Sequence, residues 1–474
     1  MKIFSYSKLS PFKILFIKPG VNTPVPLLDI PLGILSLSAY IKKYAPFPIQ
    51  TFCLDLRLNK NPKVLKKTID SIQPHLIGIS LMDSESEFLY KNQSILEEYC
   101  HNISFVAGGP FATINYDQIL KKTCISLVIV GEGEYSFFNL ILNLINGEPL
   151  AKVPGLAWRS VNGEFFFNGR APYIENLDEI PIPDYDLIDL EKYQGYHPNM
   201  NGVLAENRYI QIMSSRACPF NCIFCHNIFG KRVRQRSVQH FIKEIKILYY
   251  QYNIREFHII DDYFNFNPKR MHVILDEIVN EGLKIKIAFP NALRGDQLTK
   301  KDLILLKQAG TYMITFAIET GSKRIQNITK KRINIQKILQ NISQAKKMGI
   351  ITRGYFMLGF PGESRQELQK TIDLACKSDL SMVSFFSVIP FKNTGLYDWL
   401  LEEYPGIDSL PETSFWSKGT YYSKMTGIPL KKIKKRATLR FYSVNRLIWL
   451  IKNVPRRFYF VSRFLHSAIS ILSS

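Results

Sequence analysis

The first 150 residues place short, apolar, strand-like runs at regular intervals along the chain. Each run is apolar throughout, which is typical of strands that are covered on both faces. The segments between the runs are long enough for crossover helices. We therefore expect a doubly wound parallel sheet of the α/β class. Its predicted strands are residues 13–18, 49–56, 76–82, 103–109 and 125–131.

A second series of strand-like runs follows, with helical segments between them. One of these helices has Thr299 as a plausible N-cap, Asp302 three residues later and Gly310 as a stop. Six βα units in succession predict a partial (β/α)6 barrel of the TIM type, whose chemistry lies at the carboxyl ends of the strands. Its predicted strands are residues 208–215, 256–262, 284–290, 312–319, 352–359 and 382–390.

Two stretches lack this periodicity. Residues 151–205 are rich in proline and predict an ordered linker, and the chain after residue 395 is basic and mostly helical. We therefore divide the sequence into 1–150, 151–205, 206–395 and 396–474.

The cysteines are few and odd in number, which argues against a disulfide framework and favours a reducing compartment. We expect a cytoplasmic protein without a secretory signal, and without a membrane span because no run of 18 apolar residues occurs. Four cysteines are scattered singly in apolar or helical surroundings and are given no role. They are Cys53, Cys100, Cys124 and Cys376.

The other three cysteines, Cys218, Cys222 and Cys225, lie in the segment "RACPFNCIFCHN" with the spacing CxxxCxxC. Three thiols cannot all pair with one another. Zinc needs a fourth ligand; His226 adjoins the last cysteine, but no second CxxC follows. A 4Fe–4S cluster held by three thiolates would leave one iron open to an exogenous ligand.

The segment "CPFNCIFC" resembles the cysteine motif of the radical S-adenosylmethionine (SAM) enzymes, in which an aromatic residue, here Phe224, precedes the last cysteine. The resemblance implies that the open iron binds SAM and that one electron splits the sulfonium to give a 5′-deoxyadenosyl radical. "IIDDYF", "AIETGS" and "RGYFMLGFPGES" resemble later strand-end motifs of the same family. They imply a SAM site formed by Phe224, Asp261, Asp262, Glu319, Arg353, Gly359, Phe360, Pro361 and Gly362, with Glu363 beside it.

The first 150 residues are similar to cobalamin-binding, Rossmann-like domains that are fused to radical SAM barrels. "DIPLGILSLSAYIKK", "VAGGPFATINYDQIL" and "VIVGEGEYSF" carry this resemblance. The DxHxxG motif is absent, so we expect no histidine on the lower face of the cobalt. The implied cobalamin-binding residues are Ser80, Gly108, Gly109, Pro110, Gly131, Glu132 and Gly133.

Relatives with this architecture imply methyl transfer from methylcobalamin to an unactivated carbon or phosphorus centre of a small-molecule or lipid substrate. A radical rearrangement or oxygen-independent cyclisation, as in the anaerobic magnesium-protoporphyrin cyclase branch, uses the same cofactors. A non-catalytic cobalamin or iron–sulfur sensor is the alternative of another class. The resemblance to radical SAM enzymes also implies an external electron donor such as flavodoxin or ferredoxin.

The net charge of +21 is concentrated near the end of the sequence. From residue 429 to 474 there are eleven Lys and Arg residues and no Asp or Glu, interleaved with aromatic and aliphatic residues. This pattern suits helices that pack on the barrel with their charges in water, or peripheral contact with the inner face of an anionic membrane. Nucleic acid is not the favoured partner.

Overall fold

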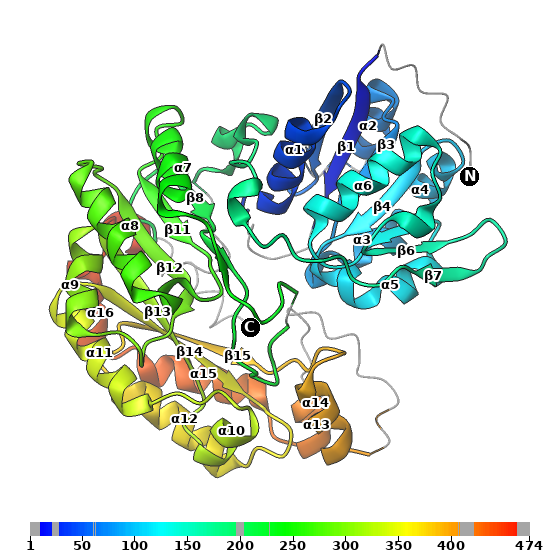
Figure 1. Cartoon of the computed structure of the whole chain (residues 1–474). Helices are drawn as coiled ribbons and strands as arrows, with labels where there is room; N and C mark the ends of the chain where they lie inside the picture. Colours follow the sequence, from blue (N-terminus) through cyan, green and yellow to red (C-terminus); the bar gives the residue numbers. More distant parts are fainter. Residues whose placement is uncertain are drawn as a thin grey trace. The chain divides into compact units, whose positions relative to one another are not determined.

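The computed structural model describes residues 10–20, 28–59, 61, 63–195, 203–226, 228–405, 407 and 421–461 (Figure 1). The chain forms two compact units, Met1–Tyr193 and Gln194–Ser474. No described helix is both long and apolar enough to cross a membrane.

Among its described residues, the first unit contains a sheet of seven strands in the order β2-β1-β3-β4-β5-β6-β7. The first five strands are parallel, which confirms the predicted doubly wound sheet. They are β1 (Phe12–Lys18), β2 (Ile49–Asp55), β3 (Leu76–Ser80), β4 (Ser104–Gly108) and β5 (Leu127–Ile129).

Helices cover both faces of this sheet. One apolar cluster packs α2, α4 and α5 on one face, and a second packs α1 and α6 on the other. This two-sided burial explains why the strand residues are apolar throughout. The helices are α1 (Leu32–Tyr44), α2 (Val64–Ile72), α3 (Glu87–Lys91), α4 (Gln93–Cys100), α5 (Pro110–Lys122) and α6 (Gly133–Asn146).

Two further strands, β6 (Leu156–Arg159) and β7 (Phe165–Phe167), lie in the stretch that the sequence predicts as a linker. They add an antiparallel edge, with β6 paired to β5 and β7 paired to β6. Both strands are short, and the run of three phenylalanines in β7 is exposed, so no alternation of polar and apolar residues marks it. The sheet is therefore mixed at this edge.

Cys100 and Cys124 form a disulfide in the structure, with their Cα atoms 6.5 Å apart. No role was expected for these two residues, and the pairing corrects that expectation. Cys100 ends α4 and Cys124 follows α5, and both side chains pack against the apolar cluster on that face of the sheet. The fold, and not their separation in the sequence, brings them together.

In the part of the second unit that the structure describes, six parallel strands form a sheet in the order β15-β14-β13-β12-β11-β8. Sequential parallel strands with helices along the outer side form the predicted partial barrel (Figure 1). The strands are β8 (Tyr209–Ile212), β11 (Glu256–Ile259), β12 (Lys286–Leu293), β13 (Thr311–Glu319), β14 (Ile351–Leu358) and β15 (Met382–Ser387), with the short pair β9 (Ser215–Arg216) and β10 (Arg234–Gln235) beside them.

The helices of the barrel connect consecutive strands. The capping box predicted for Thr299 and Asp302 is present at the start of α9, where each side chain bonds to the other residue's backbone amide. The helices are α7 (Val238–Tyr250), α8 (Pro268–Asn280), α9 (Lys300–Gln308), α10 (Lys323–Ile328), α11 (Ile335–Lys347) and α12 (Arg365–Lys377). Short 3-10 helices span Asp83–Glu85, Leu150–Lys152, Leu177–Glu179, Tyr185–Leu187, Leu190–Tyr193 and Phe264–Phe266.

The C-terminal region packs on the barrel. Leu450, Val454 and Phe460 join an apolar cluster with the first residues of several strands, such as Met313 and Ile351. The described part of this region contains four helices: α13 (Gly395–Glu403), α14 (Tyr421–Thr426), α15 (Leu430–Phe441) and α16 (Val444–Asn453). The sequence allowed two interpretations of this region, packing on the barrel or contact with a membrane. In its described part, the structure shows helices packed on the barrel.

Candidate active site

The three-cysteine loop follows β8 and β9 at the carboxyl end of the second sheet. Ala217 has a φ of +79°, a left-handed conformation that is strained for a residue with a side chain and turns the chain into the loop. The Ile223 amide donates to the Thr329 carbonyl at 3.1 Å, and the Cys225 amide donates to the Cys222 carbonyl at 3.1 Å. The second of these bonds closes a turn that brings Cys222 and Cys225 together.

The thiols of Cys222 and Cys225 are hydrogen-bonded to each other. This bond, together with the nearby charge of Lys331, lowers the pKa of Cys222 to about 6 although burial opposes the shift. The same bond and burial raise the pKa of Cys225. Burial also raises the pKa of Cys218, which accepts a hydrogen bond from the Phe220 amide. Across the described ranges, no three His, Cys, Asp or Glu side chains already converge as a metal site.

Lys331 is the cation next to these thiols, although no motif in the sequence indicated it. Its ammonium lies 2.9 Å from Glu319 Oε1 and 5.7 Å from the centre of the Phe224 ring. Burial by itself lowers the pKa of Lys331, but the charges of Glu319, Cys222 and Cys225 outweigh it and raise that pKa above its ordinary value. A permanent positive charge therefore faces the cysteine loop.

Glu319 sits at the end of β13 in a strained conformation, with a φ of +68° next to a register shift between β13 and β14. Such strain persists where surrounding contacts over-determine the backbone, and it is frequent at functional sites. The Lys331 ion pair is one such contact, because both side chains are nearly buried, at 14% and 10% exposure.

Arg294, just after β12, is a second cation that the sequence analysis missed. Its guanidinium stacks 4.0 Å from the centre of the Phe220 ring in the cysteine loop. It also pairs with Asp296 at 2.7 Å and donates to the Lys331 carbonyl at 3.3 Å. Arg294 thus ties the cysteine loop to the segment that carries Lys331.

The segment from Gly359 to Ser364 follows β14 at the same end of the barrel. Glu363 accepts hydrogen bonds from the amides of Gly359 at 2.7 Å and Phe360 at 3.0 Å. Burial raises the pKa of Glu363 to about 7, although these two bonds oppose the shift. The hydroxyls of Tyr421 and Tyr422, from α14, donate to the carbonyls of Gly359 and Glu363.

The two glycines of this segment are required by its conformation. Gly359 has a φ of +92°, and a Cβ there would lie 2.7 Å from Leu430 Cδ2. Gly362 has a φ of +60°, and a Cβ there would lie 2.6 Å from the Glu403 carboxylate. A side chain at either position would be strained by the positive φ, and it would force Leu430 Cδ2 or the Glu403 carboxylate to move.

Phe360 connects this segment to the cysteine loop. It is fully buried, and its ring centre lies 6.3 Å from that of Phe224 and 6.3 Å from that of Trp399. The buried Pro361 follows it. The structure therefore brings Phe224, Phe360 and the three cysteines to one end of the barrel.

The acidic pair after β11 lies beside the cysteine loop but is partly engaged. Asp261 is buried and accepts hydrogen bonds from Ser214, through its amide and hydroxyl, and from the Ser215 hydroxyl, all at 2.5–2.6 Å. Burial raises the pKa of Asp261 despite these bonds. Asp262 accepts a bond from the Ala217 amide, and desolvation and the charge of Asp261 raise its pKa. Asp261 thus braces the strand ends, and Asp262 is the better placed of the two for a ligand.

The structure does not bring Arg353 to this group. Arg353 is the third residue of β14 and pairs in register with Met382, the first residue of β15. It lies five residues before Leu358, which is about 16 Å along a strand. Its position near the start of the strand separates it from the strand ends where the other predicted residues gather.

The residues predicted for cobalamin lie together at the carboxyl edge of the first sheet. Ser80 and Gly108 end β3 and β4 as register partners, and Pro110 begins α5. Glu132 is buried at the N-cap of α6, and Gly133 begins that helix.

Two glycines leave this edge open. No described heavy atom lies within 4 Å of a Cβ built on Gly108 or on Gly131, whose φ is +98°. Gly109 has a φ of +90° and would place a Cβ 2.7 Å from the Leu81 carbonyl oxygen. Thr113 was not among the predicted residues, and its hydroxyl accepts a hydrogen bond from the Gly131 amide at 3.1 Å. A backbone without side chains at this edge fits the close approach of a large, flat ligand.

Comparison with known proteins places this geometry in a family. Residues 212–375 match the model of the radical SAM superfamily, and residues 21–141 match that of the B12-binding domain. An uncharacterised methyltransferase of Pyrococcus horikoshii is 33% identical over 436 residues, or 90% of each chain. The chain belongs to the cobalamin-dependent radical SAM enzymes.

Two other proteins extend the comparison. The cytidylyl-2-hydroxyethylphosphonate methyltransferase of Streptomyces wedmorensis is 25% identical over 81% of this chain and 80% of its own length. The fold of the radical SAM methyltransferase TsrM from Kitasatospora setae, solved with cobalamin and a 4Fe–4S cluster, matches with a TM-score of 0.68 at 18% identity. That match covers 87% of this chain and 82% of TsrM.

As a cobalamin-dependent radical SAM enzyme, the protein uses a 4Fe–4S cluster, SAM and cobalamin. Enzymes of this superfamily act on small-molecule substrates and need an external electron donor. The donor set fits the cluster, because three thiols share one loop, one of them has a lowered pKa and two cations adjoin it. The bound cofactors supply the radical and the methyl-carrying chemistry, and this chain's residues hold and orient them.

Proposed function

We propose that this enzyme transfers a methyl group from SAM to an unactivated carbon or phosphorus centre of a small-molecule substrate. The proposal depends on two features that occur together in this chain. A three-thiol loop lies next to the Gly359–Ser364 segment, and glycines leave an open sheet edge within the region that matches the B12-binding domain. The methyltransferases similar to this chain over most of its length support the direction of the reaction.

The residues of the second unit have distinct roles in this proposal. Cys218, Cys222 and Cys225 hold the cluster, and Phe224 and Phe360 border the bound SAM. Glu319 and Lys331 form a buried ion pair that keeps the end of β13 in its strained conformation beside the SAM site. The fully buried Phe360 forms an apolar wall of the proposed SAM site, and such a wall helps to keep water away from a reactive radical.

The open backbone at Gly108 and Gly131 accommodates cobalamin in the first unit. Ser80, Pro110, Glu132 and Gly133 line the same edge, at the ends of β3, β4 and β5 where ligands of parallel sheets bind.

The test is an anaerobic assay of reconstituted protein with SAM that carries a deuterated methyl group. One turnover consumes two SAM molecules and two electrons, and it yields methylated product, S-adenosylhomocysteine, 5′-deoxyadenosine and methionine. We expect mass spectrometry to find the deuterated methyl group in the product. We also expect S-adenosylhomocysteine and 5′-deoxyadenosine to form in equal amounts. Deoxyadenosine without S-adenosylhomocysteine would refute methyl transfer and indicate a rearrangement or cyclisation instead.

A further inference from the structure

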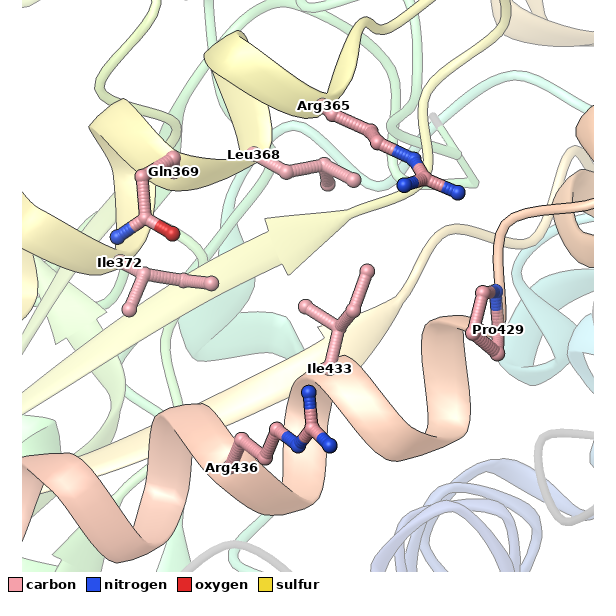
Figure 2. A pocket seen from close by; sticks show the side chains of 7 residues that line it. All are labelled: Arg365, Leu368, Gln369, Ile372, Pro429, Ile433 and Arg436. Atoms are coloured by element: carbon pink, nitrogen blue, oxygen red, sulfur yellow. The ribbon is translucent and has the colours of Figure 1, made fainter.

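A groove lies between α12 and α15 on the surface of the second unit. Its volume is about 260 Å³, and Figure 2 shows its seven lining residues. Leu368 and Ile372 from α12 and Ile433 from α15 form an apolar floor, and Arg365 and Arg436 stand at its rim.

The two arginines carry uncompensated charge. Both are exposed, and neither forms a hydrogen bond or an ion pair with another described residue. The nearest acids on α12 are already paired, Glu367 with Arg324 at 2.8 Å and Asp373 with Arg440 at 2.6 Å. Guanidinium groups left without partners at the rim of an apolar groove favour an anionic partner.

More positive charge surrounds the groove. Lys432 and Lys435 lie on α15 near Arg436, and the described residues from 421 to 461 include no Asp or Glu. Such a field of one sign accelerates association with an acidic partner and makes it sensitive to salt.

The groove adjoins the segment that borders the SAM site. Arg365 directly follows Ser364, and Leu430, at the start of α15, packs against Gly359. Phe360 in the same segment contacts Phe224 of the cysteine loop, with ring centres 6.3 Å apart. A partner seated on the groove would therefore lie close to the end of the barrel that carries the cluster ligands.

We propose that the groove between α12 and α15, with its basic surround, docks an acidic one-electron carrier protein that reduces the enzyme. This proposal depends on one part of the proposed function, namely that SAM cleavage consumes electrons. In the step itself, one electron leaves the reduced carrier and enters the cluster. A small, charge-complementary contact is typical of transient redox complexes.

The test uses a reduced flavodoxin as the carrier and the charge-reversed double variant Arg365→Glu/Arg436→Glu. At low ionic strength, stopped-flow absorbance should show cluster reduction slowed by about tenfold or more, with a weaker salt dependence. Reduction by dithionite, which needs no docking surface, should keep its wild-type rate. Binding of flavodoxin to the cluster-free protein, measured by biolayer interferometry, should weaken in parallel. None of these readouts requires methyl transfer, so the failure of one proposal is distinguishable from the failure of the other.

Two matched variants control for folding and for total charge. Arg365→Lys/Arg436→Lys should retain fast reduction by flavodoxin. Lys300→Glu/Lys301→Glu changes the same number of exposed charges on α9 and should also leave it unchanged. The proposal is overturned if the α9 variant slows reduction as much as the groove variant, or if the groove variant reacts like wild type. Binding to anionic phosphatidylglycerol vesicles that is lost in the groove variant, with unchanged flavodoxin kinetics, would overturn it in favour of a lipid surface.

Discussion

The Lys331–Glu319 ion pair offers the sharpest test of the site. Their atoms lie 2.9 Å apart, and the side chains are 14% and 10% exposed. At an effective dielectric constant of about 20, two unit charges at this distance attract by about 6 kcal/mol before the cost of desolvation. Replacing Lys331 by methionine keeps most of the side-chain volume but leaves Glu319 buried without its cation.

We expect Lys331→Met to lower the free energy of unfolding by about 3–5 kcal/mol, because an uncompensated buried charge is more costly than a missing pair. The double variant Glu319→Gln/Lys331→Met should recover much of this loss. Lys66→Met, which removes one partner of the exposed Lys66–Glu98 pair, is the matched control and should leave stability unchanged. Urea unfolding of the cluster-free proteins under anaerobic conditions measures all three.

The same variants carry a redox prediction. Loss of the cation beside Cys222 and Cys225 makes addition of an electron to the cluster less favourable, so Lys331→Met should shift the midpoint potential to more negative values. The double variant restores the local net charge and should return the potential toward that of wild type. A single variant with wild-type unfolding and wild-type potential would refute the reasoning about this pair.

Four further predictions concern Glu363, two glycines of the first unit and the cluster cysteines. The pKa of Glu363 is about 7, above its ordinary value of 4.5, so the folded protein binds that proton more tightly and stability falls as the pH rises between these values. Glu363→Gln should remove this pH dependence. At pH 8 its free energy of unfolding, measured with urea, should exceed that of wild type by about 3 kcal/mol. Gly131→Ala should weaken cobalamin binding, measured by visible absorbance, at a cost of about 1–2 kcal/mol in stability. Gly109→Ala, which places a Cβ 2.7 Å from a carbonyl oxygen, should lose more stability than Gly131→Ala in the same unfolding assay. Alanine at each of the three cluster cysteines should abolish the iron and sulfide found by chemical analysis after reconstitution, and retention of a full cluster would contradict the ligand assignment.

The parallel strands of both sheets could be predicted from the sequence, because a strand that is buried on both faces is a continuous run of apolar residues. The short strands β6 and β7 lack such a buried apolar run, since Phe165–Phe167 is exposed at a sheet edge. The partner of Cys100 was likewise hidden, because Cys124 reaches it only through the packing of α4 and α5.

The site shows the same division between local and non-local information. The cysteine loop and the Gly359–Glu363 segment are contiguous motifs, so the sequence alone could indicate them. Lys331 lies more than a hundred residues from Cys222 and faces it only because strand ends meet at one end of the barrel. Arg353 is only six residues before Gly359 in the sequence, but it lies near the start of β14 and Gly359 follows the end of that strand. The two residues are therefore far apart in space.

The packing of α16 against the first residues of the barrel strands bears on how the protein is made. Arg456 donates to the carbonyl of Glu206 at 3.2 Å, across 250 positions of sequence. Residues late in the sequence thus complete a core whose other members lie much earlier in the chain. During synthesis, the nascent second unit therefore exposes an apolar surface until α16 emerges, which makes it a natural client for chaperones.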